Sequence, residues 1–272
     1  MASLMTPPFA LRPVINIGRA VRFRFAHIGN ITNLVWAVLA RASNLGSHNI
    51  RMITKTTLNQ IRFGGLHAIP LIAALAVLIG GVAIIEAFSI LSGLADDLIG
   101  SLLVGVVLRE LAPLVTAVVF IGRSGTAMAT EIGSMRLNGE VDALIAHRID
   151  PIAFIVLPRV IASIVCIYIL TVVFNLVGIL GGAGAALLLK NISFSILIGK
   201  IASAFSNAEI ILFLIKGGLF GTVIGVLSCY FGLRVTYSRT ELPRAVTKAA
   251  VGSLVWIFAL DGFLALIHYL IT

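Results

Sequence analysis

Residues 152–180 read IAFIVLPRVIASIVCIYILTVVFNLVGIL and carry a single charge, at Arg159. A helix needs about 20 mainly apolar residues to cross the hydrocarbon core of a bilayer, so this stretch is long enough to cross it with some tilt. A transmembrane β-strand needs only about 10 residues and alternates in polarity, which this stretch does not do. The stretch therefore predicts a transmembrane helix.

Four other stretches are similarly long and apolar, and together they predict five spans, at 66–88, 98–122, 152–180, 210–231 and 249–271. The chain of 272 residues is 59% hydrophobic and 11% charged. Soluble domains average about 45–50% apolar and about 25% charged residues, so the expected solvent of this chain is lipid. The predicted fold class is an all-α integral membrane protein, with residues 66–272 forming one five-helix domain.

The distribution of Lys and Arg predicts the orientation of the spans. Three flanks are rich in these residues: the one before the first span, the one between the second and third, and the one between the fourth and fifth. Of the other two connections, one holds Asp96 and Asp97 and no Lys or Arg, and the other holds Lys190 and Lys200. Because cytoplasmic connections are the basic ones, we expect a cytoplasmic N-terminus and a periplasmic C-terminus. This topology accounts for the net charge of +9 without a nucleic-acid partner.

The segment before the first span is basic, and we divide it in two. Residues 1–49 are expected to be partly disordered or interfacial, and they show no pattern of a cleaved signal peptide. In residues 50–65, Ile50, Ile53, Leu58 and Ile61 fall near one helical face, with Lys and Arg on other faces. This pattern favours an amphipathic helix in the lipid headgroup layer, and the alternative is a loose basic tail.

The chain lacks the motifs of a catalyst. It has no G-x-x-x-x-G-K-[ST] phosphate loop, no His/Cys spacing typical of zinc and no serine nucleophile elbow. Cys166 and Cys229 lie in apolar stretches and are interpreted as small hydrophobic residues. We therefore expect no enzymatic activity, no metal and no cofactor bound by this chain, so that any energy source lies in another subunit.

Charges inside the predicted spans are the most informative feature. Arg109 and Glu110 lie in the second span, Lys216 in the fourth and Asp261 in the fifth, while Glu86 is near the outer end of the first. A charge at mid-bilayer costs at least about 2.5–3.5 kcal/mol, so such residues usually face a bundle interior or a cavity. The alternatives are a polar cavity that handles a charged headgroup and a buried ion pair that only joins helices.

The geometry of a straight helix adds two expectations about this region. Arg109 and Glu110 are sequence neighbours that start about 100° apart on the helix, so they are not expected to pair with each other. Pro113 has no N–H to donate to the carbonyl of Arg109, so that carbonyl is expected to be available to another donor.

Residues 122–158 form the longest patterned connection. Asn138 and Gly139 can start a short helix, Glu140 and Asp142 favour its first turn, and Pro151 ends it. A short helix in a cytoplasmic connection suits docking on another subunit, and a plain solvated connector is an equally good interpretation.

Across this region the chain resembles the MlaE/YrbE family, the permeases of MCE-associated lipid ABC transporters. The resemblance covers roughly residues 50–272 and is carried by several short matches: RELAP at 109–113, GRSG at 122–125, EIG at 131–133, EVDAL at 140–144, Asp150-Pro151 and Pro158-Arg159. Two positions depart from the pattern of this family, because Ala112 replaces a glycine and Glu86 replaces a glutamine.

The resemblance implies an ATP-driven function. The chain would be the transmembrane permease subunit that moves phospholipid or a related lipid between the inner membrane and the outer membrane or cell envelope. Its partners would be a second copy of itself, a cytoplasmic ABC ATPase that holds ATP and Mg, a periplasmic MCE-domain protein and, in some systems, a STAS-domain protein. The expected location is the bacterial inner membrane.

The resemblance also implies roles for individual residues. Residues 131–151 would include the coupling helix that seats in the ATPase, with contacts from Glu131, Gly133, Arg136, Glu140, Asp142, Leu144 and Arg148. The polar intramembrane residues of the lipid cavity would be Arg109, Glu110, Asp261, Lys216 and Glu86. Two alternatives of other classes are an ion-coupled secondary carrier and a membrane scaffold that transports nothing.

Overall fold

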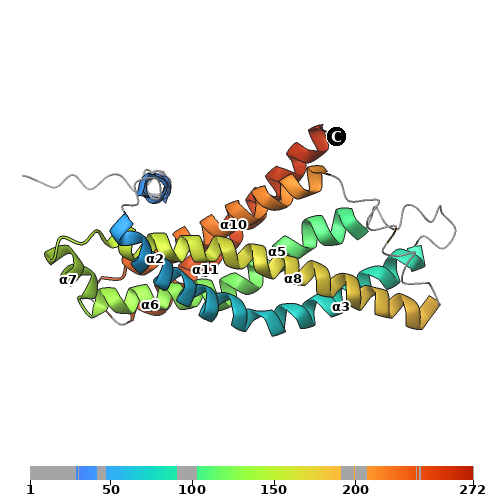
Figure 1. Ribbon diagram of the computed structural model, residues 1–272, viewed down its shortest axis with the longest axis horizontal. Coiled ribbons are helices and arrows are strands. Elements are labelled where there is room, and N and C mark those ends of the chain that lie inside the picture. The colour runs from blue at the N-terminus through green and yellow to red at the C-terminus, as the bar shows by residue number, and fades with distance from the viewer. Residues whose placement is uncertain are drawn as a thin grey trace, which may run out of the picture.

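The computed structural model describes residues 29, 31–41, 47–90, 103–190, 199, 207–236, 238 and 240–271. Every regular element in these ranges is a helix (Figure 1). Five helical runs are long and apolar enough to span a membrane: Ile53–Ala83, Val107–Leu137, Ile152–Gly184, Glu209–Leu233 and Glu241–Leu270. The prediction of an all-α protein with five spans is therefore confirmed.

The first span continues a helix that begins before it. Helix α2 (Ser47–Gln60) passes through a π-helical turn, η2 (Ile61–Gly65), and a 3₁₀ turn, η3 (Leu66–Ala68), into α3 (Ile69–Ile90). Gln60 and Leu66 both keep right-handed helical backbone angles, so no loop separates α2 from α3. The location of α2 in the headgroup layer stays a prediction. A shorter apolar helix, Ile31–Arg41, precedes it, and residues 1–28 lie outside the described ranges.

The second helical run extends beyond the apolar residues that define the span. It consists of η4 (Leu103–Leu111, π-helical), α5 (Ala112–Phe120), η5 (Ile121–Gly125, π-helical) and α6 (Thr126–Leu137). Our expectation of a loop from residue 122 onward is wrong, because the chain stays helical to Leu137. Gly125 keeps helical angles, with φ −61° and ψ −46°, and α6 contains few strong helix breakers. Residues 98–102 of the predicted span lie outside the described ranges.

The remaining helices complete the bundle. A short helix, α7 (Glu140–Ala146), lies between the second and third spans, as expected from the sequence. The third span comprises η6 (Ile152–Val156, π-helical) and α8 (Leu157–Lys190). The fourth is α10 (Asn207–Leu233) and the fifth is α11 (Glu241–Ile271).

Helix α8 lies at the centre of the bundle. It packs against α2, α3, α5 and α10, and Figure 1 shows it running along most of the molecule with α3 beside it. Its residues Ile167, Leu170 and Phe174 are fully buried against Phe120 of α5 and Phe220 of α10. Large apolar residues on α3 and α11 remain exposed, for example Leu78 (64%) and Phe263 (59%), as expected for surfaces that face lipid.

Glycine allows a close backbone contact between α3 and α8. A Cβ atom added to Gly80 would lie 2.9 Å from the Cα atom of Gly178. Real side chains do not approach a backbone this closely. The absence of a side chain at Gly80 therefore lets the two backbones touch, the usual role of small residues between membrane helices.

We expect the substitution Gly80→Val to push α3 away from α8 and to lower the stability of the protein by about 1–3 kcal/mol, the usual cost of overpacking. The measurement is thermal unfolding in detergent. Gly184→Val on α8 is the matched control, because a Cβ atom at Gly184 would meet nothing within 4 Å. Equal melting temperatures for the two variants would contradict this role of Gly80.

Candidate functional site

Lys216 is the best-buried charged side chain among those that the structure describes, and it lies within the apolar helix α10. The relative exposure of the whole residue is 1%. The Nζ atom lies 2.5 Å from Oε2 of Glu110 and 2.8 Å from Oδ1 of Asp261. One ammonium group therefore holds carboxylates from η4 and α11, and it joins the second, fourth and fifth spans.

The same ammonium group also reaches the backbone of the second span. Lys216 Nζ donates a hydrogen bond of 3.4 Å to the carbonyl oxygen of Arg109. Pro113 lies four residues after Arg109 and has no N–H to donate to that carbonyl. The expectation that this oxygen is available to another donor is confirmed.

Arg109, in the last turn of η4, contacts the ends of two other spans. Its Nη1 atom donates to Oε1 of Glu209 at 3.0 Å and contacts Nε2 of His268 at 2.8 Å. Arginine can only donate, so Nε2 of His268 is the acceptor in this contact. Arg109 thereby connects the second span to the beginning of α10 and the last turns of α11.

The expectation that Arg109 and Glu110 do not pair is wrong. Nε of Arg109 lies 3.4 Å from Oε1 of Glu110, although this Nε atom makes no hydrogen bond of normal geometry in the described structure. Both side chains are long, so they can turn toward the same gap between helices although their Cα–Cβ bonds diverge. The two residues form one charged unit with Lys216.

We call the six residues that make these contacts the intramembrane cluster: Arg109, Glu110, Glu209, Lys216, Asp261 and His268. The sequence singled out Arg109, Glu110, Lys216 and Asp261, and the structure brings these four together. Glu86, also predicted, is exposed on α3, and no described ion pair links it to the cluster. Glu209 and His268 were missed, because they lie at the ends of apolar stretches, where charged and polar residues are usually solvated.

Exposure divides the intramembrane cluster into two parts. The side chains of Lys216 and Asp261 are 2% and 11% exposed, whereas those of Arg109 and Glu110 are 25% and 27% exposed. Lys216 and Asp261 are therefore enclosed by the protein. Arg109 and Glu110 can in addition contact a molecule outside the bundle, so this pair is the chemically accessible part of the cluster.

The second group of predicted residues lies at the end of the molecule that carries α7. Gly139 has a positive φ of 75°, which suits glycine and lets the chain turn from α6 into α7. Glu140 and Asp142 occupy the first turn of α7, and Arg136 at the end of α6 forms an ion pair with Asp142. Buried Val141 anchors α7 on the bundle, next to the partly buried Leu144.

Glu131 connects three helices at this end. Its Oε1 atom accepts from Nη2 of Arg159 on α8 at 2.7 Å, and its Oε2 atom accepts from Gln60 on α2 at 3.2 Å. Arg159 is only 4% exposed, and its Nη1 atom also donates to the carbonyl oxygen of Ile155 at 3.0 Å. The sequence identified Glu131 but gave Arg159 no role beyond its place in a motif.

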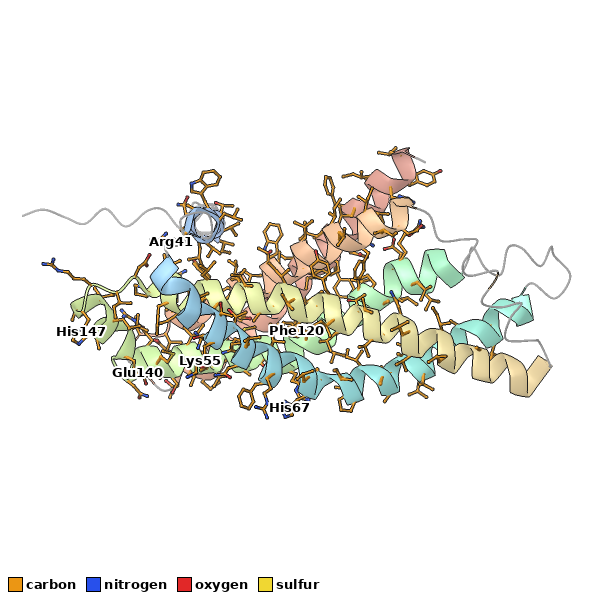
Figure 2. The ribbon with its side chains drawn as sticks, in the orientation of Figure 1. Arg41, Lys55, His67, Phe120, Glu140 and His147 are labelled. Atoms are coloured by element: carbon orange, nitrogen blue, oxygen red, sulfur yellow. The ribbon has the colours of Figure 1, made fainter. Side chains whose placement is uncertain are left out.

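The other predicted residues of this end have different environments. A Cβ atom on buried Gly133 would clash with the side chain of Leu242 in the first turn of α11, so this position packs tightly against α11. Arg148 is exposed with a positive φ of 58°. Asp150 forms an ion pair with Arg41, which ties helix Ile31–Arg41 to the segment after α7. Figure 2 shows Arg41, Glu140 and His147 gathered at this end.

A known family has the same sequence pattern. Residues 57–267 match the family described as Permease MlaE. The matched range includes α7 and all residues of the intramembrane cluster except His268. The chain belongs to this family. The resemblance seen in the short motifs is thereby confirmed over most of the chain.

Relatives of the chain have consistent descriptions. A probable ABC transporter permease protein of Rickettsia felis is 30% identical over 216 residues, which cover 79% of this chain and 81% of that protein. A probable ABC transporter permease protein of Synechocystis is 34% identical over 216 residues, 79% of this chain and 82% of that protein. The chloroplast protein TRIGALACTOSYLDIACYLGLYCEROL 1 of Arabidopsis thaliana is 35% identical over 167 residues, 61% of this chain and 48% of that protein. The chain is thus a permease subunit of an ABC transporter, and such a subunit works with an ATPase partner.

The structure predicts that Lys216→Met destabilises the protein. This substitution leaves Glu110 and Asp261 without their shared cation, and breaking a buried ion pair in this way costs about 3–5 kcal/mol. Adding Asp261→Asn to Lys216→Met removes one of the stranded charges and should recover part of the loss. Thermal unfolding is measured for the wild type, both single variants and the double variant, and this cycle gives the interaction free energy between Lys216 and Asp261. Additive effects of the two substitutions would contradict the pairing.

Proposed function

We propose that this MlaE-family permease moves phospholipid or a related lipid between the inner membrane and the outer membrane or cell envelope. The observation that carries the proposal is the partly exposed pair Arg109 and Glu110, which belongs to a charged cluster set within long apolar helices. A lipid needs apolar surroundings for its acyl chains and a few polar groups for its headgroup, and this region offers both.

The chemistry of the pair fits a lipid headgroup. A guanidinium group binds phosphate oxygens through several N–H donors, and a carboxylate binds an ammonium group. Arg109 would hold the phosphate and Glu110 any amine, while Lys216 and Asp261 fix the position of Glu110 and of the Arg109 backbone. Because Arg109 keeps Glu209 and Glu110 keeps Lys216 as a counter-ion, a headgroup can be exchanged without leaving an isolated charge in the bilayer.

The relatives support a lipid as substrate. The name of the Arabidopsis relative contains that of a galactolipid, trigalactosyldiacylglycerol. Membership in an ABC transporter family also argues against a stand-alone carrier driven by an ion gradient, because the energy source is an ATPase.

The proposed assembly is a homodimer of this chain with a pair of cytoplasmic ATPase subunits that hold ATP and Mg. A periplasmic MCE-domain protein, and in some systems a STAS-domain protein, would complete it. The N-terminus and α7 would lie in the cytoplasm and the C-terminus in the periplasm. This orientation follows from the basic flanks before the first span, between the second and third spans, and between the fourth and fifth.

In the proposed mechanism, closure of the ATPase subunits pushes on the segment 131–151. Val141 fixes α7 to the bundle, and Glu131 joins α6 to α2 and α8, so the push is passed to the first three spans together. The movement narrows a cavity lined by the first, second and fifth spans of the dimer. A lipid held at Arg109 and Glu110 is then expelled or admitted.

The substitution Glu110→Ala tests the lipid site. It removes the accessible carboxylate, and we expect less co-purified phospholipid and a transport rate that falls about tenfold or more, because Lys216 also loses its 2.5 Å partner. Quantitative lipid analysis of the purified transporter and a vesicle-based transport assay measure the two effects. If lipid occupancy and flux both stay at wild-type levels, Glu110 has only a structural role.

The substitution Glu140→Lys tests the coupling role of α7. It reverses an exposed charge in the first turn of the helix, where an acidic side chain also favours the helix dipole. We expect ATP hydrolysis to continue while lipid transport falls. His147→Lys, an exposed change just after the same helix, is the matched comparison. Unchanged transport in Glu140→Lys at normal protein levels would count against coupling through α7.

A further inference from the structure

An open pocket of about 820 Å³ lies beside α7 at the same end of the molecule. Its walls come from α2, α6, η6 and the first turns of α7 and α8. Figure 2 shows Glu140, one of its lining residues, next to the end of α6. The polar residues of its lining are Thr56, Thr126, Thr130, Glu131, Ser134, Glu140 and Arg159.

Four of these side chains, those of Thr126, Thr130, Glu131 and Glu140, offer hydrogen-bond acceptors to the pocket. The hydroxyl of Thr126 donates to the carbonyl oxygen of Gly122 at 2.6 Å, and the hydroxyl of Thr130 donates to the carbonyl oxygen of Thr126 at 2.8 Å. Both hydroxyl protons are therefore used within the continuous helix formed by η5 and α6, and the lone pairs of the hydroxyl oxygens remain. The carboxylates of Glu131 and Glu140 are exposed and can only accept.

The one cation in the lining is already committed. Arg159 donates to Glu131 at 2.7 Å and to the Ile155 carbonyl at 3.0 Å, and its side chain is only 5% exposed. With two carboxylates and one guanidinium, the lining has a formal charge of −1. The pocket is therefore complementary to a cationic group that donates several hydrogen bonds.

The position of the pocket along α6 decides between a lipid amine and a protein side chain. The apolar part of the second span ends at Ile121, and Arg123 follows. At about 1.5 Å of rise per residue, Glu131 lies about 15 Å further along the helix axis. The headgroup layer on each side of a bilayer is only about 5–8 Å thick. Glu140 follows nine residues later, in the first turn of α7 and outside the predicted spans, so the pocket includes an acceptor on the side of the membrane where α7 projects.

We propose that this pocket receives a lysine or arginine side chain of the ATPase partner, with Glu131 and Glu140 as its acceptors. The inference rests on the proposed function in one respect, since it takes the α7 end as the docking end. Glu131 also binds Arg159 and Gln60. The incoming side chain thus binds at the point where α2, α6 and α8 are joined, so movement of the ATPase reaches three helices through one contact.

A photo-crosslinking experiment identifies the occupant. Thr130→Cys introduces an exposed thiol, whereas the two native cysteines, Cys166 and Cys229, are buried. The variant is labelled with a maleimide benzophenone reagent in membranes that contain the whole transporter, irradiated, and digested for mass spectrometry. We expect adducts in an ATPase peptide that contains a lysine or arginine at or beside the labelled site. Adducts to lipid, or only within the permease, would overturn the inference.

A charge experiment tests the same pocket independently. Thr130→Lys places an ammonium group in the pocket and should lower the affinity of the permease for its ATPase about tenfold, because like charges then meet. Thr130→Met controls for the size of the new side chain, and Thr247→Lys controls for a lysine added elsewhere. Each control should change the affinity for the ATPase less than about twofold. Thr247 is also exposed, with its hydroxyl bonded one turn back to the Pro243 carbonyl at 3.0 Å, so it controls for added charge elsewhere.

The outcomes separate this inference from the proposed function. If the ATPase co-purifies with the wild type but Thr130→Lys binds it normally, the pocket is not the docking site and the lipid-transport function stands. If no ATPase co-purifies with the wild type in mild detergent, both the pocket inference and the proposed assembly fail.

Discussion

The buried ammonium group of Lys216 is the constraint on which the rest of the bundle depends. An unpaired charge in an apolar helix would be excluded from the bilayer core, so α10 can occupy its place only if other spans supply oxygens there. Glu110, Asp261 and the Arg109 carbonyl supply them from the second and fifth spans. The positions of three helices are therefore set by one side chain, while the close glycine contact between Gly80 and Gly178 sets the first span against the third.

The intramembrane cluster and the α7 end are physically connected, because one helical run carries parts of both. Arg109 and Glu110 lie near one end of the run Val107–Leu137, and Glu131 and Arg136 lie near the other. At about 1.5 Å per residue this run is about 46 Å long, well beyond the hydrocarbon thickness of about 30 Å. A displacement of α6 by a partner would therefore move Arg109 and Glu110, the proposed lipid-binding pair, without any intervening loop.

The sequence predicted the features that depend on apolar length and on the rarity of charge in lipid. Hydropathy identified the five spans, and the cost of burial identified Arg109, Glu110, Lys216 and Asp261 as a group. The sequence did not predict that α6 continues the helix of the second span, because a polar helix and a polar loop have similar composition. The sequence also missed the partners Glu209, His268 and Arg159. A residue at the edge of an apolar stretch looks solvated until the fold brings a second charge to it.

The contacts of Lys216 also have a consequence for biosynthesis. Spans enter the membrane in the order in which the ribosome makes them, so each charged residue meets only what has been made before it. Arg109 and Glu110 enter side by side, and their charges balance. When α10 follows, Glu110 is already available to Lys216, and when α11 comes last, Lys216 is available to Asp261. The linear order of these charges thus allows each span to be inserted beside an existing counter-ion, and a permuted order of the same helices would lose that advantage.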